Sequence, residues 1–459
     1  MAEEQPASAG DKIERQAVVV IHGMGEQRPT DTLRDFVAGV LSVLRKRKDG
    51  ANITVWSKPD SVGDIYETIR LTMSSTSSLE LTDFYEFYWA HNMRGTNFGH
   101  MTSWIKRLLF TRVKRIPKHL RKLWYTFWGA TALLSITLIV LLWWKDGPSW
   151  KQLLAPFLSL AVTSVVFSLI GSFVKTTFLN SAGDAARYFT PSPDNISERS
   201  NIRQQGIRFL EKLHELQTKE KVGRIIIVAH SLGSVVAYDL MRLLWTKYNE
   251  THNSPVNPDQ EAIKKMNTCI HEQNDIGDAG IDAFQQLQYD CWKEQRRMGN
   301  KWLITDFITV GAALNALDYF MVTNVPVEEL KVQRELPTCP PVKDLKGKDL
   351  YFGKNYSVGG EPQTIRLLNH GAMFTVTRWT NIYYTSDFVG GNMRTVFGNG
   401  IRDIAIPRKS PWIYPGGHTR YWDKNDKQNA LHQIVQAMRL DKDKTRKDVP
   451  AVPQTSAPE

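Results

Sequence analysis

Two short runs of uninterrupted apolar residues stand out from the polar pattern of the chain. They are AVVVI (17–21) and IIIVA (225–229). Branched residues without polar alternation are typical of strands buried in a parallel sheet. A glycine-rich loop follows the first run, while a tight turn and an apolar helix follow the second. The pattern predicts an α/β fold with a mostly parallel sheet flanked by helices.

Other segments extend this predicted sheet and its helices. Their expected bounds are 83–90, 302–311, 378–386 and 402–407 for strands, and 30–46 and 196–219 for helices. The stretches 247–300 and 337–362 lack clear periodicity, so we expect insertions over the sheet. Residues 1–16 form a polar segment without a cleavable signal peptide. The polar, proline-rich residues 440–459 predict a disordered tail.

Two long apolar runs, 123–144 and 152–174, interrupt the α/β pattern. As a helix each would reach roughly 33 Å, which is enough to cross a hydrocarbon core of about 30 Å. The sequence therefore predicts a transmembrane helical hairpin, and a pair of buried core helices is the alternative. The hairpin divides one α/β domain into the parts 17–122 and 175–439. Two crossings return the chain to the same side, as one shared sheet requires.

The net charge of +11 is concentrated before the first apolar run. Residues 101–122 contain eight lysines and arginines and no acidic residue. Such a segment can be a positive-inside signal, a surface helix on anionic lipid or a nucleic-acid patch. Its place beside a span favours the first two and a lipid bilayer as partner, with no nucleic acid. Both parts of the domain are then expected on the cytosolic face of a membrane.

The segment AHSLGS (229–234) has the spacing of a turn that presents a nucleophilic serine. Small residues are needed two positions before and after this serine, because strand and helix approach closely there. Here these positions are Ala229 and Gly233, and His230 precedes Ser231. Ala229 stands where the usual pattern has glycine. We expect Ser231 to be a nucleophile, and the alternative is an ordinary serine at a strand end.

A serine nucleophile needs a histidine base and an orienting carboxylate. His418 lies in the glycine-flanked loop YPGGHTRYW after the last expected strand, and His370 is its main rival. Asp387 follows the strand expected at 378–386, and a simple turn aspartate is the alternative role. Asp306 lies inside a strand and Asp318 on the following helix, so neither is well placed. The candidate triad is Ser231, Asp387 and His418.

The oxyanion of such a reaction needs backbone N–H donors. The residue after the nucleophile, Leu232, offers one, and Met24 in the loop His22-Gly23-Met24-Gly25 offers a second. The alternative is a plain tight turn, and His22 itself is expected to be structural. The three cysteines, Cys269, Cys291 and Cys339, fit neither a disulfide framework nor a zinc site. They indicate a reducing compartment, and no metal or cofactor is expected.

These motifs resemble the α/β-hydrolase superfamily, and within it membrane-associated, lipase-like serine hydrolases seen mainly in bacteria. The resemblance covers roughly residues 15–440 outside the apolar hairpin. It rests on the segments IHGMGEQ, YEFYWA, GDAARYF, AHSLGS, DFITVG, WTNIYYTSDFVGG and GGHTRYW. It implies the same triad and oxyanion donors, and a bacterial inner membrane as location. Ala229 and the segment GAALNA (311–316) depart from the pattern, and the second departure affects the shape of the pocket.

The sequence thus predicts a membrane-anchored serine hydrolase that cleaves carboxylic esters through an acyl-enzyme. A position beside the bilayer favours a lipid ester as substrate. Two alternatives stay open at this point. One is a hydrolase of small soluble esters or thioesters, and the other is a catalytically silent α/β-hydrolase scaffold that serves as a membrane interaction module.

Overall fold

The computed structural model describes the α/β part of the chain. The described residues are 15–23, 28–93, 196–252, 260–272, 276–317, 325–342, 350–358, 361–387, 389–407, 418–424 and 430–442, with isolated residues between 113 and 188. The predicted span 152–174 lies outside them, and only scattered residues of 123–144 are described. No helix among the described residues combines the length and the apolar character needed to cross a membrane.

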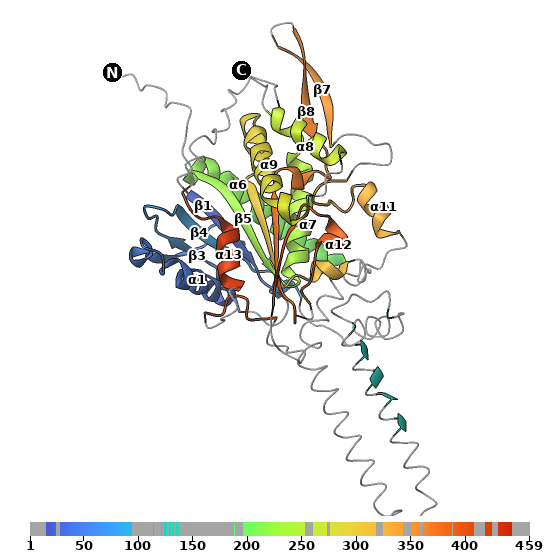
Figure 1. The fold of residues 1–459 in the computed structure, drawn as a ribbon. Helices are drawn as coiled ribbons and strands as arrows, with labels where there is room; N and C mark the ends of the chain where they lie inside the picture. Colours follow the sequence, from blue (N-terminus) through green and yellow to red (C-terminus); the bar gives the residue numbers. More distant parts are fainter. Residues whose placement is uncertain are drawn as a thin grey trace, which may run out of the picture.

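The core is one mixed sheet of eight strands, in the order β10-β9-β6-β5-β1-β4-β3-β2 (Figure 1). In this order the strands are Arg402–Ile406, Arg378–Tyr384, Ile304–Val310, Val222–His230, Arg15–Ile21, Leu81–Phe87, Ile69–Met73 and Val55–Pro59. Strands β10 to β4 are parallel to one another. The last two form an antiparallel hairpin at the edge. The α/β class predicted from the apolar runs is confirmed, and β1 pairs directly with β5.

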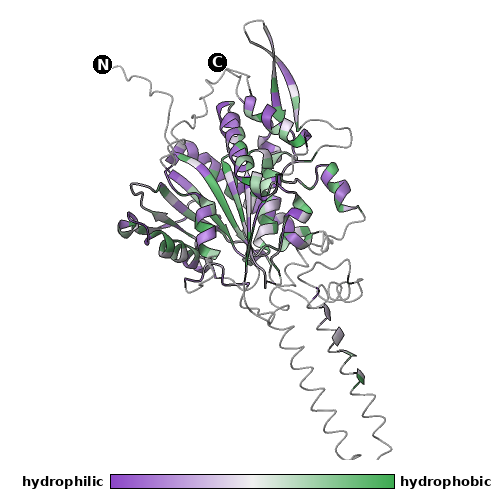
Figure 2. Ribbon diagram, viewed as in Figure 1, coloured by the Kyte–Doolittle hydropathy of each residue, from purple (hydrophilic) through white to green (hydrophobic). Residues whose placement is uncertain are grey.

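Helices cover both faces of this sheet. Their bounds are α1 Asp31–Leu44, α6 Ile196–Glu220, α7 Gly233–Tyr248, α8 Glu261–His271, α9 Gly277–Arg297, α11 Val327–Val332, α12 Arg394–Phe397 and α13 Ala430–Met438. Short 3-10 turns lie at Gly50–Asn52, Ala90–Asn92, Ala313–Ala316 and Met373–Thr375. Figure 2 shows apolar residues concentrated in the central strands and polar residues on the outer helices.

Alternate residues of each central strand serve two separate cores. Val18 and Val20 of β1 face α1 and α13, whereas Val19 and Ile21 face the core that includes α6, α7 and α9. Both faces of β1 are therefore buried, which explains why its sequence is a continuous apolar run rather than an alternating one. The same holds for β5 and β6, so the strand that leads into Ser231 is fixed from both sides.

The structure adds regular elements where the sequence showed no periodicity and extends both ends of the domain. The stretch 247–300 contains the two helices α8 and α9, and 337–362 contributes to a separate hairpin of β7 (Tyr351–Val358) with β8 (Glu361–Leu368). At the chain ends, β1 begins at Arg15, inside the segment expected to precede the domain. Leu440 is buried, so the fold continues into the predicted tail. The 3-10 turn at Ala313–Ala316 occupies most of the unusual GAALNA segment.

Candidate active site

The turn after β5 holds Ser231 in an uncommon backbone conformation. Its φ is 52°, in the left-handed region that non-glycine residues rarely adopt. The Ser231 N–H donates to Val310 O at 3.1 Å, and the Ser231 carbonyl accepts from Ser234 N–H at 3.1 Å. Such strain, about 1–3 kcal/mol, persists only where surrounding contacts impose it, and it is concentrated at functional sites. The turn thus has the form expected of a nucleophile elbow.

Close approach of β1 and α7 makes glycine necessary after the serine. A Cβ on Gly233 would lie 2.3 Å from His22 O and 2.5 Å from Ile21 O. Ala229, by contrast, is fully buried in the regular part of β5, where it pairs with Ile21 and Thr309. The extra methyl group that set this turn apart from the usual pattern is accommodated in the packed sheet.

The structure brings the three predicted triad residues together. His418 Nε2 lies 2.8 Å from Ser231 Oγ, and His418 Nδ1 lies 3.0 and 3.1 Å from the two Asp387 oxygens. Ser231 directly follows β5, while Asp387 follows β9, which lies two strands away across β6. All three side chains are buried. Residues separated by up to 187 positions in sequence thus form one hydrogen-bonded chain.

Asp387 is held in its ionised form. Burial alone would raise its pKa, but the adjacent His418, the Tyr421 hydroxyl and the Val389 N–H together lower the pKa to about 2. Tyr421 Oη donates to Asp387 Oδ2 at 2.6 Å, and Val389 N–H donates to Oδ1 at 2.8 Å. Tyr421 Oη also accepts from the Tyr384 N–H at 3.0 Å. The carboxylate therefore stays charged at neutral pH and can orient and stabilise a histidine cation.

Of the two predicted oxyanion donors, Leu232 lies among the described residues and Met24 does not. Leu232 immediately precedes α7, and amides at a helix start have no carbonyl of the same helix to bond. Met24 and Gly25 lie outside the described residues. Gly23 is packed against the elbow, because a Cβ there would lie 2.8 Å from Ser231 Cβ. The described segment His22-Gly23 that follows β1 (the β1 loop) therefore lies beside the serine.

His22 has a structural environment. Its Nε2 accepts from Trp89 N–H at 3.2 Å, so the ring proton lies on Nδ1 and is donated to Gly23 O at 2.8 Å. The ring stacks on Trp89 with centroids 5.2 Å apart. Burial lowers the pKa of His22 to about 4, which keeps it neutral. His22 thus shapes the β1 loop, and no ring atom is left to act as a base.

The rival residues occupy other places. His370 lies in the turn after β8 with its side chain only partly covered, and this partial burial together with Arg334 and Arg242 lowers its pKa. Asp306, inside β6, binds Arg224 at 3.2 Å and Arg378 at 2.8 Å. Burial would raise the pKa of Asp306, but the surrounding arginines lower it. Asp306 is therefore part of a buried ionic network, and Asp318 lies outside the described residues.

Another buried carboxylate lies near the end of β4, beside Thr30. Glu86 of β4 accepts the Thr30 N–H through Oε2 at 2.7 Å, while its Oε1 has no partner in the described structure. Thr30 has a φ of 73° and directly precedes α1. Burial raises the pKa of Glu86 to about 7, with a smaller contribution from Asp31. Glu86 lies in the YEFYWA segment, but sequence reasoning assigned it no role.

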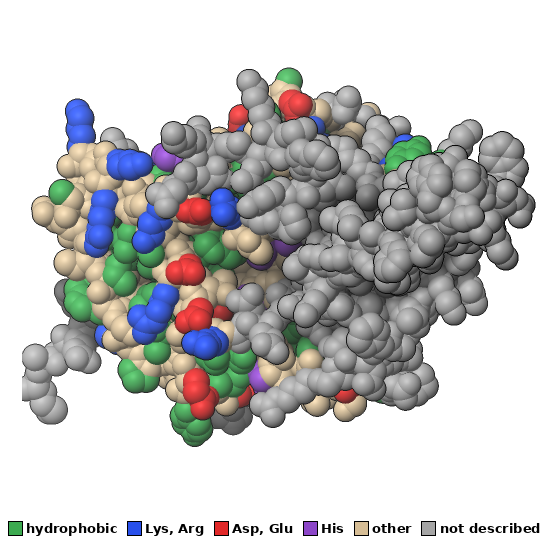
Figure 3. Space-filling view, turned by 90° about the horizontal axis from the view of Figure 1, so that it is seen from below, with side chains coloured by type: hydrophobic (Ala, Val, Ile, Leu, Met, Phe, Trp, Pro, Cys, Tyr) green, Lys and Arg blue, Asp and Glu red, His purple; other side chains and the backbone are tan. Residues whose placement is uncertain are grey.

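Within the described ranges, no three His, Cys, Asp or Glu side chains are grouped so as to hold a metal ion. Figure 3 shows the molecule from below, where cationic and anionic side chains are mixed over the described surface with apolar side chains between them.

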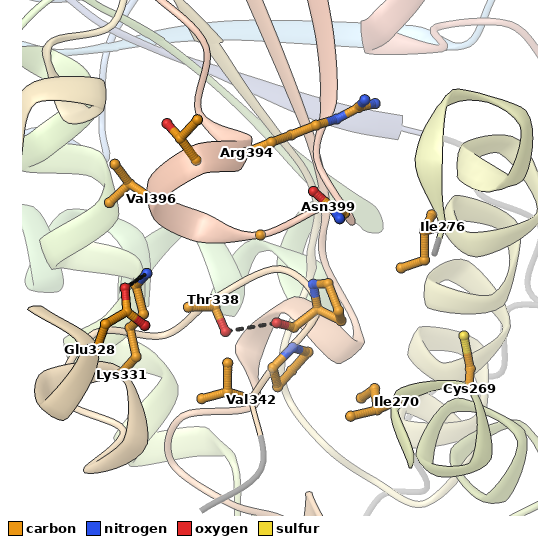
Figure 4. A pocket seen from close by; sticks show the side chains of 14 residues that line it. Cys269, Ile270, Ile276, Glu328, Lys331, Thr338, Val342, Arg394, Val396 and Asn399 are labelled. Atoms are coloured by element: carbon orange, nitrogen blue, oxygen red, sulfur yellow. Dashed lines mark hydrogen bonds and ion pairs between the residues drawn. The ribbon is translucent and has the colours of Figure 1, made fainter. Parts of the chain in front are cut away.

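A cavity of about 470 Å³ lies elsewhere, between α8, α11 and α12 (Figure 4). None of the predicted site residues lines it. Of the two cations on its wall, Lys331 pairs with Glu328 and Arg394 with Asp278, both at 2.7 Å. These ion pairs balance the charge that would otherwise attract an anionic ligand.

The described geometry can carry out acyl transfer, because nucleophile, base and carboxylate form one hydrogen-bonded series. Comparisons with protein-family models, curated proteins and solved structures found no match to the chain.

Proposed function

We propose that the protein is a serine hydrolase of the α/β-hydrolase class that cleaves carboxylic esters. The observation that carries the proposal is the series Ser231 Oγ, His418 Nε2 at 2.8 Å, and Asp387 on His418 Nδ1. Three further features support it: the left-handed backbone of Ser231, the glycine two residues later, and the chain order of serine, acid and histidine.

The proposed reaction begins with transfer of the Ser231 hydroxyl proton to His418. Because Nδ1 donates to the Asp387 carboxylate, Nε2 carries the lone pair that accepts this proton. Ser231 Oγ then attacks the ester carbonyl, and the resulting oxyanion is bound by the N–H groups of Leu232 and Met24. His418 returns the proton to the leaving alcohol, which leaves an acyl-serine. Water, deprotonated by His418, releases the acid and restores the serine.

We further propose that the substrate is a lipid ester at a bilayer surface. This part rests on sequence: the apolar runs 123–144 and 152–174 and the basic segment 101–122 that precedes them. A chain anchored in this way would meet esters of phospholipids, acylglycerols or acylated membrane proteins at high local concentration. A triad next to a bilayer is therefore expected to act faster on substrate in vesicles than on the same ester in monomeric form.

The test is labelling of the full-length protein in membranes with a fluorophosphonate probe. Wild-type protein should be labelled at Ser231, and Ser231→Ala should abolish labelling and lower kcat by several orders of magnitude, roughly 10⁴-fold or more. Ser57→Ala, at an exposed position of edge strand β2, is the matched control and should react as wild type. Absence of labelling in folded wild-type protein would refute hydrolase function and favour the silent scaffold. Labelling of Ser231 combined with ester hydrolysis that vesicles do not accelerate would favour a soluble ester as the substrate.

A further inference from the structure

His230 lies between the nucleophile and the base of the proposed site. It ends β5, directly before Ser231, and its side chain is buried. Its Nε2 lies 2.8 Å from the backbone carbonyl oxygen of His418. Because a carbonyl oxygen only accepts, the ring proton must lie on Nε2. The other ring edge faces the β1 loop, since a Cβ on Gly23 would lie 3.0 Å from His230 Nδ1.

Aromatic rings enclose this histidine. Its ring centroid lies 4.9 Å from that of His418, 5.0 Å from Trp422 and 5.9 Å from Tyr421. These three neighbours belong to the short segment 418–424, which consists of turns rather than a helix or strand. The His230 ring therefore packs against the segment that carries the proposed base, as well as bonding to its main chain.

The environment also keeps His230 uncharged. Burial, and then the neighbouring His418, lower the pKa of His230 to about 3, and His22 acts in the same direction. The His418 carbonyl and Asp387 favour the cation but are outweighed. A second positive charge beside His418 would oppose formation of the imidazolium ion during the reaction.

The base is held both through its ring and through its main chain. Its ring is oriented by Asp387 through Nδ1, and its main-chain carbonyl accepts the His230 hydrogen bond from within the turns of 418–424. A displacement of about 1 Å of a catalytic group can lower a rate by about 10²-fold. A donor that holds the His418 carbonyl therefore has a direct effect on the distance from Nε2 to Ser231 Oγ.

We propose that His230 is a positioning residue, which holds the main chain of His418 through an Nε2–H hydrogen bond and thereby fixes the base on the nucleophile. The proposal rests on the serine hydrolase function proposed above. His230 touches no reacting atom. It connects the end of β5, the β1 loop and the segment 418–424 that carries His418.

Two substitutions of similar size separate the hydrogen bond from simple packing. The amide nitrogen of His230→Gln can take the place of imidazole Nε2, whereas that of His230→Asn reaches only as far as Nδ1. With a monomeric ester, we expect His230→Asn to lower kcat about 30-fold with KM changed less than about twofold. His230→Gln should retain kcat within about threefold of wild type.

The outcomes distinguish this inference from the proposed function. If wild-type protein hydrolyses ester and both variants match its kcat, the positioning role is refuted while the hydrolase proposal stands. Equal losses in both variants with unchanged melting temperatures would also refute it, because the donor position would not matter. If folded wild-type protein is not labelled by fluorophosphonate at all, the proposed function itself fails.

A spectroscopic measurement on wild-type protein tests the same inference and does not depend on enzymatic activity. Protein labelled with ¹⁵N-histidine, in detergent, should give a His230 imidazole that is protonated at Nε2 and unprotonated at Nδ1, with no titration between pH 5 and 8. The signal can be assigned by its loss in His230→Gln. A His230 ring that titrates in this range, or that carries its proton on Nδ1, would overturn the inference.

Discussion

Gly233→Ala should damage both the fold and the reaction, because the new methyl group has no space. Its carbon would lie 2.3 Å from His22 O and 2.5 Å from Ile21 O. Favourable contacts between heavy atoms lie at roughly 3.5 Å, so the start of α7 and the end of β1 must separate by about 1 Å. Both groups are main chain in a buried sheet, and rotation of a side chain cannot relieve the clash.

The magnitude follows from this separation. Overpacking of a buried site costs about 1–3 kcal/mol, and a clash with main chain belongs at the upper end of that range. The same shift moves the β1 loop away from Ser231, so we expect kcat to fall by about 10²-fold. Gly280→Ala in α9 is the matched control, because its nearest new contact is 3.8 Å away. It should keep kcat and raise stability by up to about 1 kcal/mol.

The assay is a thermal melt together with the rate of ester hydrolysis or fluorophosphonate labelling for each variant. Ala229→Gly should keep most of the activity, and its free energy of unfolding should fall by about 1 kcal/mol because glycine makes this segment of a buried strand more flexible in the unfolded state. A Gly233→Ala protein with the melting temperature and labelling rate of wild type would show that β1 and α7 do not approach as described. Ser231 would then not lie in a tight strand-to-helix turn that requires glycine at position 233.

Three further predictions concern charge and anchoring. Asp387→Asn should lower kcat by about 10⁴-fold in protein that still folds, and a wild-type rate would place the carboxylate elsewhere. The pKa of Glu86 is raised to about 7, so the folded state holds this proton more tightly than the unfolded state does. The free energy of unfolding should therefore fall by about 3 kcal/mol as the pH rises from 4.5 to 7. Glu86→Gln should therefore gain in melting temperature over wild type between pH 5 and 8, unlike exposed Glu67→Gln. Deleting 123–174 should release active protein from membranes, and retention in the pellet would identify another anchor.

Sequence patterns predicted the strands that are buried on both faces, but they did not predict the helices α8 and α9. The reason for the second outcome lies in α9, which buries Gln285, Gln288 and Arg296 together with its apolar residues. Gln288 donates to the Phe374 and Thr377 carbonyls at 2.6 and 2.9 Å, and Gln285 donates to Trp379 O at 3.1 Å. Polar residues that bond to backbone inside the core interrupt the apolar period on which prediction depends.

The edge hairpin β2–β3 escaped prediction for a different reason. Four of the five residues of β2 are exposed, so its sequence, VWSKP, has no buried face to create an alternating pattern. Its position is set by pairing with β3, which in turn pairs with β4. Main-chain pairing of this kind leaves little trace in the order of side chains.

The candidate triad could be predicted because order along the chain and strand ends restrict the choice, whereas its supporting contacts could not. Tyr421 donates to Asp387 across 34 residues, and His230 bonds to the main chain of His418 across 188 residues. Both lie within segments that the sequence had already singled out, AHSLGS and GGHTRYW. Residue type alone, however, does not indicate whether a histidine or tyrosine in a loop binds substrate, a carboxylate or a carbonyl.

Three histidines at the carboxyl ends of the strands illustrate how the environment divides these roles. His22 and His230 each donate to a backbone carbonyl, and burial keeps both neutral with pKa values of about 4 and 3. A carbonyl cannot stabilise a full positive charge as a carboxylate does. His418 instead faces the ionised Asp387, so a proton taken from Ser231 is balanced by a neighbouring negative charge. The group that accepts the ring N–H, a carbonyl or a carboxylate, therefore decides which of these histidines is suited to the proposed role of base, rather than closeness to the serine.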